Sequence, residues 1–124
     1  MEPIHTTEAP VPLGPYSQAL AEGGLLFVSG QIPVDPTTGR LAGETIEDQA
    51  RQVLRNLEAV LRAGGSDWGR VLRVTVYMTD LREFARFNTL YEQTLGGARP
   101  ARSTVQVVAL PLEARLEIDA IAAR

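Results

Sequence analysis

Two charged side chains late in the chain are of types that can bind a carboxylate or act on a water molecule. Arg102 carries a planar guanidinium, which can hold a carboxylate through two parallel hydrogen bonds. Glu117 carries a carboxylate, which can position or deprotonate an attacking water molecule. The alternative is an ion pair of Arg102 with Glu117 or Asp119 across neighbouring strands, and spacing alone favours this simpler interpretation.

The strands expected around these residues place them on one face of a sheet. Residues 101–110 and 115–122 alternate in side-chain type, and we expect their more apolar faces to pack against helices. Because apolar side chains on the other face gain nothing from water, we expect a second subunit to cover that face and enclose a polar cleft. A solvated face is the alternative, and a register shift of one residue exchanges the two faces. The residues expected on the covered face are Arg102, Thr104, Gln106, Val108, Glu117, Asp119 and Ile121.

Several reactive residue types are missing or rare. The sequence has no cysteine, a single histidine (His5) and 12 basic residues that are all arginine. Thiolate nucleophiles, disulfides, cysteine-based zinc sites and sites built from several histidines are therefore excluded. Without lysine there is neither a Schiff-base amine nor a phosphate-binding P-loop. A serine–histidine–aspartate triad would depend on His5.

Length and charge indicate one ordinary globular domain. The 124 residues are 44% hydrophobic and 22% charged, and we expect residues 1–124 to form a single domain. The net charge of −3 argues against a nucleic-acid partner, because such proteins usually carry an excess of basic residues. No signal sequence or membrane-spanning run is recognisable, so we expect a cytoplasmic protein without a membrane partner.

The first half of the chain predicts an arm, a hairpin and a helix. Prolines keep residues 1–15 extended, and residues 16–21 and 25–29 form a hairpin around two glycines. Thr45, with Asp48 three residues later, is typical of a helix start. Apolar residues then recur at helical spacing until a Gly-Gly pair ends the helix.

The second half predicts a strand, a helix and two strands. Residues 71–79 alternate, with Leu72, Val74, Val76 and Met78 on the apolar face. Asp80 is expected to cap the second helix. The order β-β-α-β-α-β-β predicts an α+β two-layer sandwich, with two helices on one face of a mixed sheet. The stripe expected on the second helix is Leu81, Phe84, Ala85, Asn88 and Tyr91.

Several sequence blocks resemble the Rid family of reactive intermediate deaminases, also called the YjgF or L-PSP endoribonuclease family. Each block alone is a weak signal, but their order and spacing over nearly the whole chain are specific. The arginine at position 102 resembles the RidA branch. The blocks are residues 14–19 (GPYSQA), 28–33 (VSGQIP), 100–103 (PARS), 110–111 (LP), 116–118 (LEI) and 121–122 (IA).

The resemblance implies a chorismate-mutase-like fold that assembles as a homotrimer, with one site in each cleft between subunits. It implies hydrolysis of 2-imino and 2-enamino acids, such as 2-iminobutanoate and 2-iminopropanoate, to 2-keto acids and ammonia. Such imines leak from pyridoxal-phosphate enzymes that act on serine and threonine. No cofactor is implied, because an imine carbon is already electrophilic and the protein need only fix the carboxylate and aim a water molecule.

The family pattern also implies roles for individual residues. It makes Arg102 the carboxylate ligand and Glu117 the residue that acts on water. Thr104 departs from the pattern, because many RidA members have cysteine there, and this removes thiol chemistry. Structural roles are the alternatives: an interface aromatic for Tyr16 or a satisfied buried amide for Asn88. The positions that match the substrate cleft are Tyr16, Ser29, Gly30, Asn88 and Thr104.

Two other functions stay open. One is a metabolite-binding or holdase trimer without turnover, which replacement of Arg102 by alanine would leave intact while abolishing hydrolysis. The other is the endoribonuclease of the older family name. Cofactor-free RNA cleavage usually needs an acid–base pair, often with histidine, and His5 lies in the arm of a chain without a basic tract.

Overall fold

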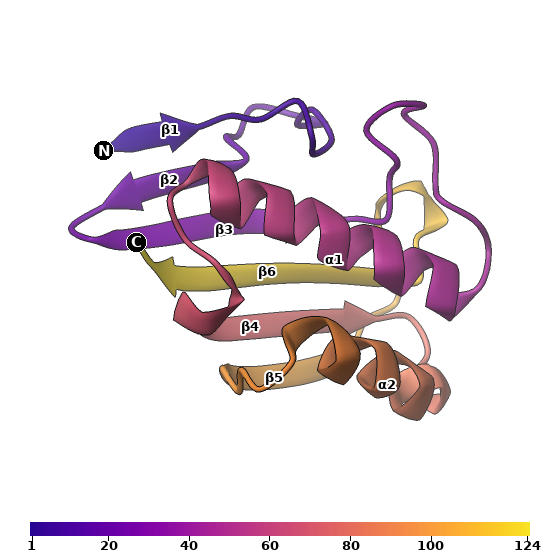
Figure 1. Cartoon of the computed structure of the whole chain (residues 1–124). Helices are drawn as coiled ribbons and strands as arrows, with labels where there is room; N and C mark the ends of the chain where they lie inside the picture. The colour runs from indigo at the N-terminus through magenta and orange to yellow at the C-terminus, as the bar shows by residue number, and fades with distance from the viewer.

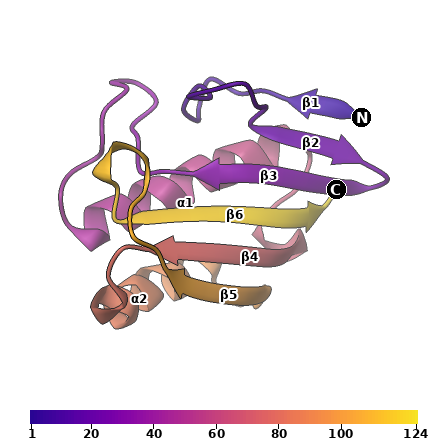
Figure 2. The ribbon, with the colours of Figure 1, turned by 180° about the vertical axis from the view of Figure 1, so that it is seen from behind.

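The computed structural model describes all of residues 1–124 and has the predicted α+β two-layer architecture (Figure 1). Six strands form one mixed sheet in the order β1-β2-β3-β6-β4-β5. Both helices cover the same face, and the view from behind shows the other face without a helix (Figure 2). The elements are β1 (Glu2–Ile4), β2 (Ala19–Glu22), β3 (Leu25–Gln31), α1 (Ile46–Ala63), β4 (Val71–Met78), α2 (Phe84–Leu95), β5 (Ala101–Gln106) and β6 (Leu116–Ala123).

The N-terminal arm contributes a strand that the sequence did not predict. β1 pairs antiparallel with β2 and becomes the edge of the sheet. The buried Gln18 side chain pins the arm, because its amide accepts a hydrogen bond from Thr6 N (2.8 Å) and donates to Thr6 O (3.0 Å) and Pro10 O (2.9 Å). The predicted hairpin is confirmed as β2–β3, and its turn holds Gly23 and Gly24 at φ values of 58° and 80°.

α1 has the predicted start and end. The Thr45 hydroxyl accepts a hydrogen bond from Asp48 N at 3.1 Å, which satisfies one of the free donors of the first turn. The helix ends at Gly64, where a side chain would collide with Leu26 of β3. The inner face of α1 supplies much of a single hydrophobic cluster of 24 buried residues between the helices and the sheet.

Two predicted apolar stripes need correction. Leu72 is half-exposed, because the register of β4 against β6 shifts between Val71 and Arg73 and turns Leu72 away from the core. Asp80 caps a short 3-10 turn rather than α2, and its carboxylate accepts a hydrogen bond from Arg82 N at 2.9 Å. A 3-10 turn has about three residues per turn rather than 3.6, so the residues that follow it face other directions than a continuous α-helix would give them. As a result Phe87 is fully buried and Leu81 is exposed.

The predicted faces of the last two strands are wrong for β5. β5 lies parallel to β4 and ends at Gln106, with Arg102 beside Val74 and Thr104 beside Val76. Val74 and Val76 are core residues, so Arg102, Thr104 and Gln106 lie on the helix-covered face. Glu117 and Asp119 of β6 pair with Tyr77 and Thr75 and lie on the open face, as predicted. β5 is an edge strand with polar residues on both faces, so its alternation did not reveal which face meets the helices.

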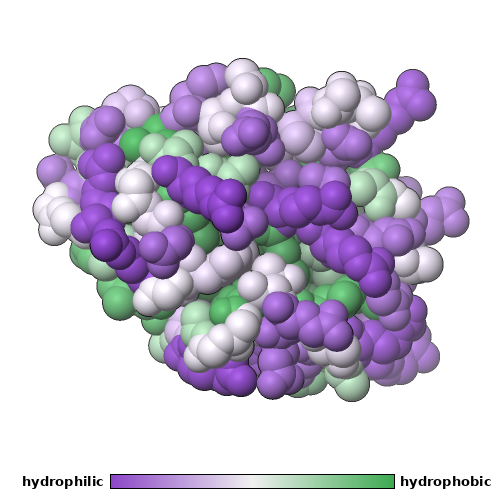
Figure 3. Space-filling model, viewed as in Figure 1, coloured by the Kyte–Doolittle hydropathy of each residue, from purple (hydrophilic) through white to green (hydrophobic).

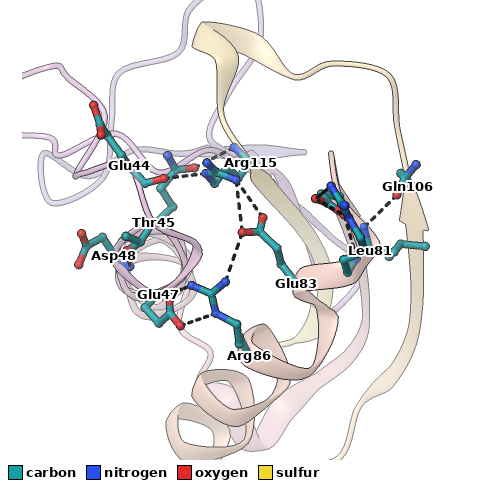
Figure 4. A network of polar contacts seen from close by, with 12 residues as sticks. Glu44, Thr45, Glu47, Asp48, Leu81, Glu83, Arg86, Gln106 and Arg115 are labelled. Carbon is teal, nitrogen blue, oxygen red and sulfur yellow. Dashed lines mark hydrogen bonds and ion pairs between the residues drawn. The ribbon is translucent and has the colours of Figure 1, made fainter.

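Charged side chains tie the starts of the two helices to the start of β6 (Figure 4). Arg115 donates to Glu44 O at 2.6 Å and to the Glu83 carboxylate at 3.1 Å. Arg86 reaches Glu83 at 3.7 Å and makes two hydrogen bonds to Glu47 at 2.8 and 2.7 Å. We call Glu47, Glu83, Arg86 and Arg115 the helix-end network. Hydrophilic residues also run across the outer surface of the helical layer (Figure 3).

Candidate functional site

The first candidate pocket opens beside Glu117. It has a volume of about 510 Å³ and lies between β3, β6 and the segment before β2. The register of β3 against β6 shifts between Val28 and Gln31, which places Ser29 and Gly30 at a bulge. A Cβ atom on Gly30 would collide with the Glu117 carboxylate, so only glycine permits this close approach. The lining residues include Tyr16, Ser29, Gly30, Pro111 and Glu117.

Glu117 is a half-buried carboxylate that forms no ion pair within the chain. Burial raises its pKa above the usual value, and the negative charge of Asp119 raises it further. Asp119 itself accepts a hydrogen bond from the Tyr77 hydroxyl at 2.9 Å. A carboxylate with a raised pKa holds a proton more readily near neutral pH, which suits a group that takes and returns protons.

The other predicted residues of this pocket are held by the backbone. The Ser29 hydroxyl donates to Ser17 O at 2.6 Å, and Ser29 N donates to Gln18 O at 2.9 Å. The hydroxyl of Tyr16 accepts a hydrogen bond from Leu13 N at 3.1 Å and keeps its own proton free to donate. Tyr16 is also half-exposed, which leaves it accessible to a ligand or to a second chain.

The second candidate pocket surrounds Arg102, on the helix side of the sheet. The guanidinium carbon of Arg102 lies 4.8 Å from the ring centroid of Tyr91 and 5.4 Å from that of Phe84, both on α2. No carboxylate lies within ion-pair distance of Arg102. Arg102 lines a hollow of about 430 Å³ next to Asn88 and Tyr91, and another of about 460 Å³ next to Phe84 and Thr104.

Unpaired polar atoms collect around Arg102. The chain has four buried side-chain nitrogen or oxygen atoms without a hydrogen-bond partner, and one of them is the indole nitrogen of Trp68. The other three are Asn88 Oδ1, Tyr91 Oη and Thr104 Oγ1, which all belong to residues that line the two hollows at Arg102. Buried polar groups are nearly always paired in native proteins, so these three atoms are available to hydrogen-bond whatever occupies the two hollows.

Tyr91 belongs to this pocket but was not predicted as a site residue. The sequence placed it in the apolar stripe, where an aromatic residue is typical of a core position. Burial raises the pKa of its hydroxyl, and the charge of Arg102 and the closeness of its N–H groups to the hydroxyl act in the opposite direction. Its spacing of three from Asn88 puts both side chains on one face of α2, and this spacing is the signal that could have identified it.

The structure therefore divides the predicted residues between two pockets. Tyr16, Ser29, Gly30 and Glu117 line the first, whereas Asn88, Arg102 and Thr104 line the hollows of the second. Because Arg102 and Glu117 lie on opposite faces of the sheet, the expectation that they converge within one chain is wrong. They can act on one ligand only where two copies of the chain meet.

Two absences concern other kinds of site. No group of three or more histidine, cysteine, aspartate or glutamate side chains is arranged to hold a metal ion. No helix is both long enough and apolar enough to span a membrane.

Comparison with known proteins identifies relatives along the whole chain. The model of the family described as endoribonuclease L-PSP matches residues 6–124. A RutC family protein of Pyrococcus horikoshii is 48% identical, over 98% of this chain and 96% of that protein. A 2-iminobutanoate/2-iminopropanoate deaminase of Mus musculus is 41% identical, over 96% of this chain and 88% of that protein.

A solved structure confirms the fold. The Escherichia coli protein TdcF, crystallised with bound serine, superposes with a TM-score of 0.96. It is 42% identical, and the match covers 100% of this chain and 99% of that one. The two-layer arrangement of helices and mixed sheet is thus shared with a protein whose crystal contains a small amino acid.

Proposed function

The chain belongs to the endoribonuclease L-PSP family, and we propose that it hydrolyses 2-imino acids to 2-keto acids and ammonia. The substrates that we expect are 2-iminobutanoate and 2-iminopropanoate. The observation that carries this proposal is Arg102, a guanidinium without a carboxylate partner among unpaired polar atoms. Such a pocket suits the carboxylate that every 2-imino acid carries. The relative named for this activity and the serine bound to TdcF support the same substrate class.

The reaction needs a fixed carboxylate and a directed water molecule. Arg102 holds the substrate carboxylate, and Glu117 takes a proton from water as the oxygen attacks the imine carbon. In the protonated imine the π electron pair moves onto nitrogen as the new carbon–oxygen bond forms, which gives a neutral carbinolamine. Glu117 then returns its proton to the nitrogen, the carbon–nitrogen bond breaks to release ammonia, and the hydroxyl proton passes to Glu117 as the carbonyl forms. Burial and the charge of Asp119 raise the pKa of Glu117, which makes its carboxylate a stronger base for the first half of this transfer.

We assign the remaining pocket residues to the shape and polarity of the site. The hydroxyl proton of Tyr16 is free to donate to the substrate or to the carbinolamine. Gly30 leaves room for the Glu117 carboxylate beside the bulge. Ser29 fixes the backbone at the bulge through its hydrogen bond to Ser17. Asn88 and Thr104 offer their unpaired oxygens beside Arg102.

We propose further that each site forms between two copies in a homotrimer. One copy supplies Arg102 with Asn88 and Thr104, and the next supplies Glu117 with Tyr16 and its neighbours. The separation of these groups on opposite faces of one sheet requires such sharing if both act on one substrate. Half-exposed Phe27 and Val105 support contact between chains at the open face, because both are apolar and poorly placed in water.

Ammonia release tests the activity. Serine or threonine dehydratase generates the imines in place, and addition of the wild-type protein should accelerate formation of ammonia and keto acid beyond the spontaneous rate. Absence of acceleration over a wide range of protein concentration would contradict the proposal. A protein that binds pyruvate but releases no ammonia would instead support the binding function.

Mixed oligomers test the shared site. Arg102→Ala and Glu117→Gln should each be inactive as pure proteins. After joint unfolding and refolding in equal amounts, roughly a quarter of the sites should regain both groups if each site combines two chains. A site within one chain would regain no activity. Mass measurement of the wild type and the mixture checks that the assemblies are the same size.

The endoribonuclease name of the family gains no support from these pockets. His5 lines neither of them, and the net charge is negative. A nuclease assay with purified wild type and Arg102→Ala therefore should detect no RNA cleavage by either protein.

A further inference from the structure

The Arg102 guanidinium contacts two aromatic rings of the same helix. Phe84 and Tyr91 are seven residues apart on α2, a separation of about 10.5 Å along a helix axis. The guanidinium carbon lies 5.4 Å from one ring centroid and 4.8 Å from the other. Both distances are within the range of a cation–π contact, so the two rings contact the guanidinium together. Arg102 accordingly lines one hollow with Tyr91 and another with Phe84.

Aromatic contacts hold a guanidinium differently from carboxylates. A ring contacts the flat face of the group and attracts its charge, but it does not occupy the N–H donors at the edge. A carboxylate occupies those donors and neutralises the charge, as Glu47 does for Arg86 through two hydrogen bonds. Arg102 is therefore positioned without the partner that would compete with a bound acid.

We propose that Phe84 and Tyr91 form an aromatic clamp that positions Arg102 to receive the carboxylate of the ligand. Both are positioning residues, because they act through the guanidinium. The identity of the ligand as a 2-keto or 2-imino acid rests on the proposed function, whereas the clamp itself rests on the two ring distances. A fixed guanidinium plane presents two parallel donors, so the clamp favours a planar carboxylate over an uncharged amide of the same size.

Pyruvate and pyruvamide serve as stable probes of this selectivity. Phe84→Leu and Tyr91→Leu keep apolar volume but remove the ring, and Tyr91→Phe is the matched control that keeps the ring without the hydroxyl. Each leucine variant should weaken pyruvate binding by roughly tenfold. Pyruvamide binding should change little in any variant. Thermal unfolding checks that each variant is folded, and nitrogen NMR of the arginine side chains measures how freely the Arg102 guanidinium rotates.

The rotation of Arg102 reports on the clamp independently of activity. It should become faster in both leucine variants and stay slow in Tyr91→Phe. Unchanged rotation in both leucine variants would overturn the clamp even if the wild type is an active deaminase. The clamp and the proposed function can also fail separately. If the guanidinium rotates faster in the leucine variants but the wild type neither binds pyruvate nor releases ammonia, the clamp is supported and the proposed function is rejected. If either leucine variant fails to fold, Phe84→Tyr and Tyr91→Phe take its place, because they keep both rings. The Arg102 guanidinium should still rotate slowly in these two variants. Fast rotation in them would overturn the clamp.

Discussion

Arg115 and Arg102 lie in the same small domain and have opposite surroundings. Arg115 belongs to the helix-end network, where a backbone carbonyl and the carboxylate of Glu83 occupy its donors (Figure 4). Arg102 contacts two aromatic rings and has no carboxylate partner. The carboxylate of Glu117 is likewise without an ion pair, although it is half-buried. We call Arg102 and Glu117 the site charges.

This difference separates charges that hold the fold from charges that await a ligand. In the helix-end network each guanidinium has its acid, so the network is complete within one chain. The site charges are kept apart by the sheet, and leaving them unpaired costs folding free energy. Natural proteins retain such costs mainly where function needs them. Mutations in the two groups should therefore affect different properties.

The largest contrast is expected between Arg102→Ala and Arg115→Ala. Loss of Arg102 removes two charge-assisted hydrogen bonds to the substrate, so kcat/KM should fall roughly 100-fold or more while Tm stays near the wild-type value. Loss of Arg115 removes hydrogen bonds within the fold and should cost about 1–3 kcal/mol, with activity largely retained in the folded protein. Coupled ammonia release and thermal unfolding of both variants measure the two effects.

A stable but inactive Arg115→Ala, or an active but unstable Arg102→Ala, would contradict the distinction between the two arginines. If Arg102→Ala unfolds at a much lower temperature, its role is structural. Arg102→Lys provides a control, because lysine keeps the charge but lacks the two parallel donors, and it should recover only a minor part of the activity.

Glu117→Gln should lower the activity of the protein and raise its stability. Because burial raises the pKa of Glu117 in the folded state, the folded protein binds this proton more tightly than the unfolded chain does. The contribution to stability is therefore present at low pH and is lost as pH rises through the raised pKa. The glutamine variant should have a higher Tm than wild type at about pH 8, and the difference should shrink towards about pH 4.

The same variant should lose activity by roughly 100-fold or more, since a general acid–base group contributes that much.

Asp119→Asn tests the pKa of Glu117 more finely. Removal of the neighbouring charge should lower the pKa of Glu117 and move the acidic limb of the kcat/KM profile to lower pH. An unmoved limb, or a glutamine variant with wild-type turnover, would show that Glu117 is not the proton carrier.

The sequence predicts local features of this molecule better than long-range ones. The start of α1 follows from Thr45 and the β2–β3 turn from two glycines, because each depends on a few adjacent residues. β1 could not be predicted in this way, since it pairs with a strand reached only after the arm folds back over Gln18. The face of Arg102 depends on parallel pairing of β5 with β4, which is also non-local.

The candidate site shows the same limit. Resemblance to a family supplied residues such as Arg102 and Glu117, but it did not reveal that the sheet separates them within one chain. Tyr91 was missed because an aromatic residue in an apolar stripe is typical of the core. Only the structure shows that its ring contacts the Arg102 guanidinium.

Thr104→Val should raise stability and weaken ligand binding, as Glu117→Gln raises stability and lowers activity, but by smaller amounts. Valine has nearly the shape of threonine and lacks the hydroxyl that is buried without a partner beside Arg102. The free energy of unfolding should rise by about 1 kcal/mol, because an unsatisfied buried polar group is removed. Pyruvate affinity should fall a few-fold if that hydroxyl contacts the ligand. Thr104→Ser keeps the hydroxyl and is the matched control, with affinity close to wild type.

The smallest effect is expected from Glu47→Gln in the helix-end network. The two hydrogen bonds from Arg86 lower the pKa of Glu47 below its usual value, so its contribution to stability is present above that usual value and is lost as pH falls through the lowered one. The pair is exposed, and exposed pairs contribute little and are screened by salt. Tm should therefore fall slightly at neutral pH and low salt, with no difference from wild type in strong salt or in acid, and kcat/KM should not change. A large loss of activity would mean that the paired charges also serve the site, and the division between the two groups of charges would then fail.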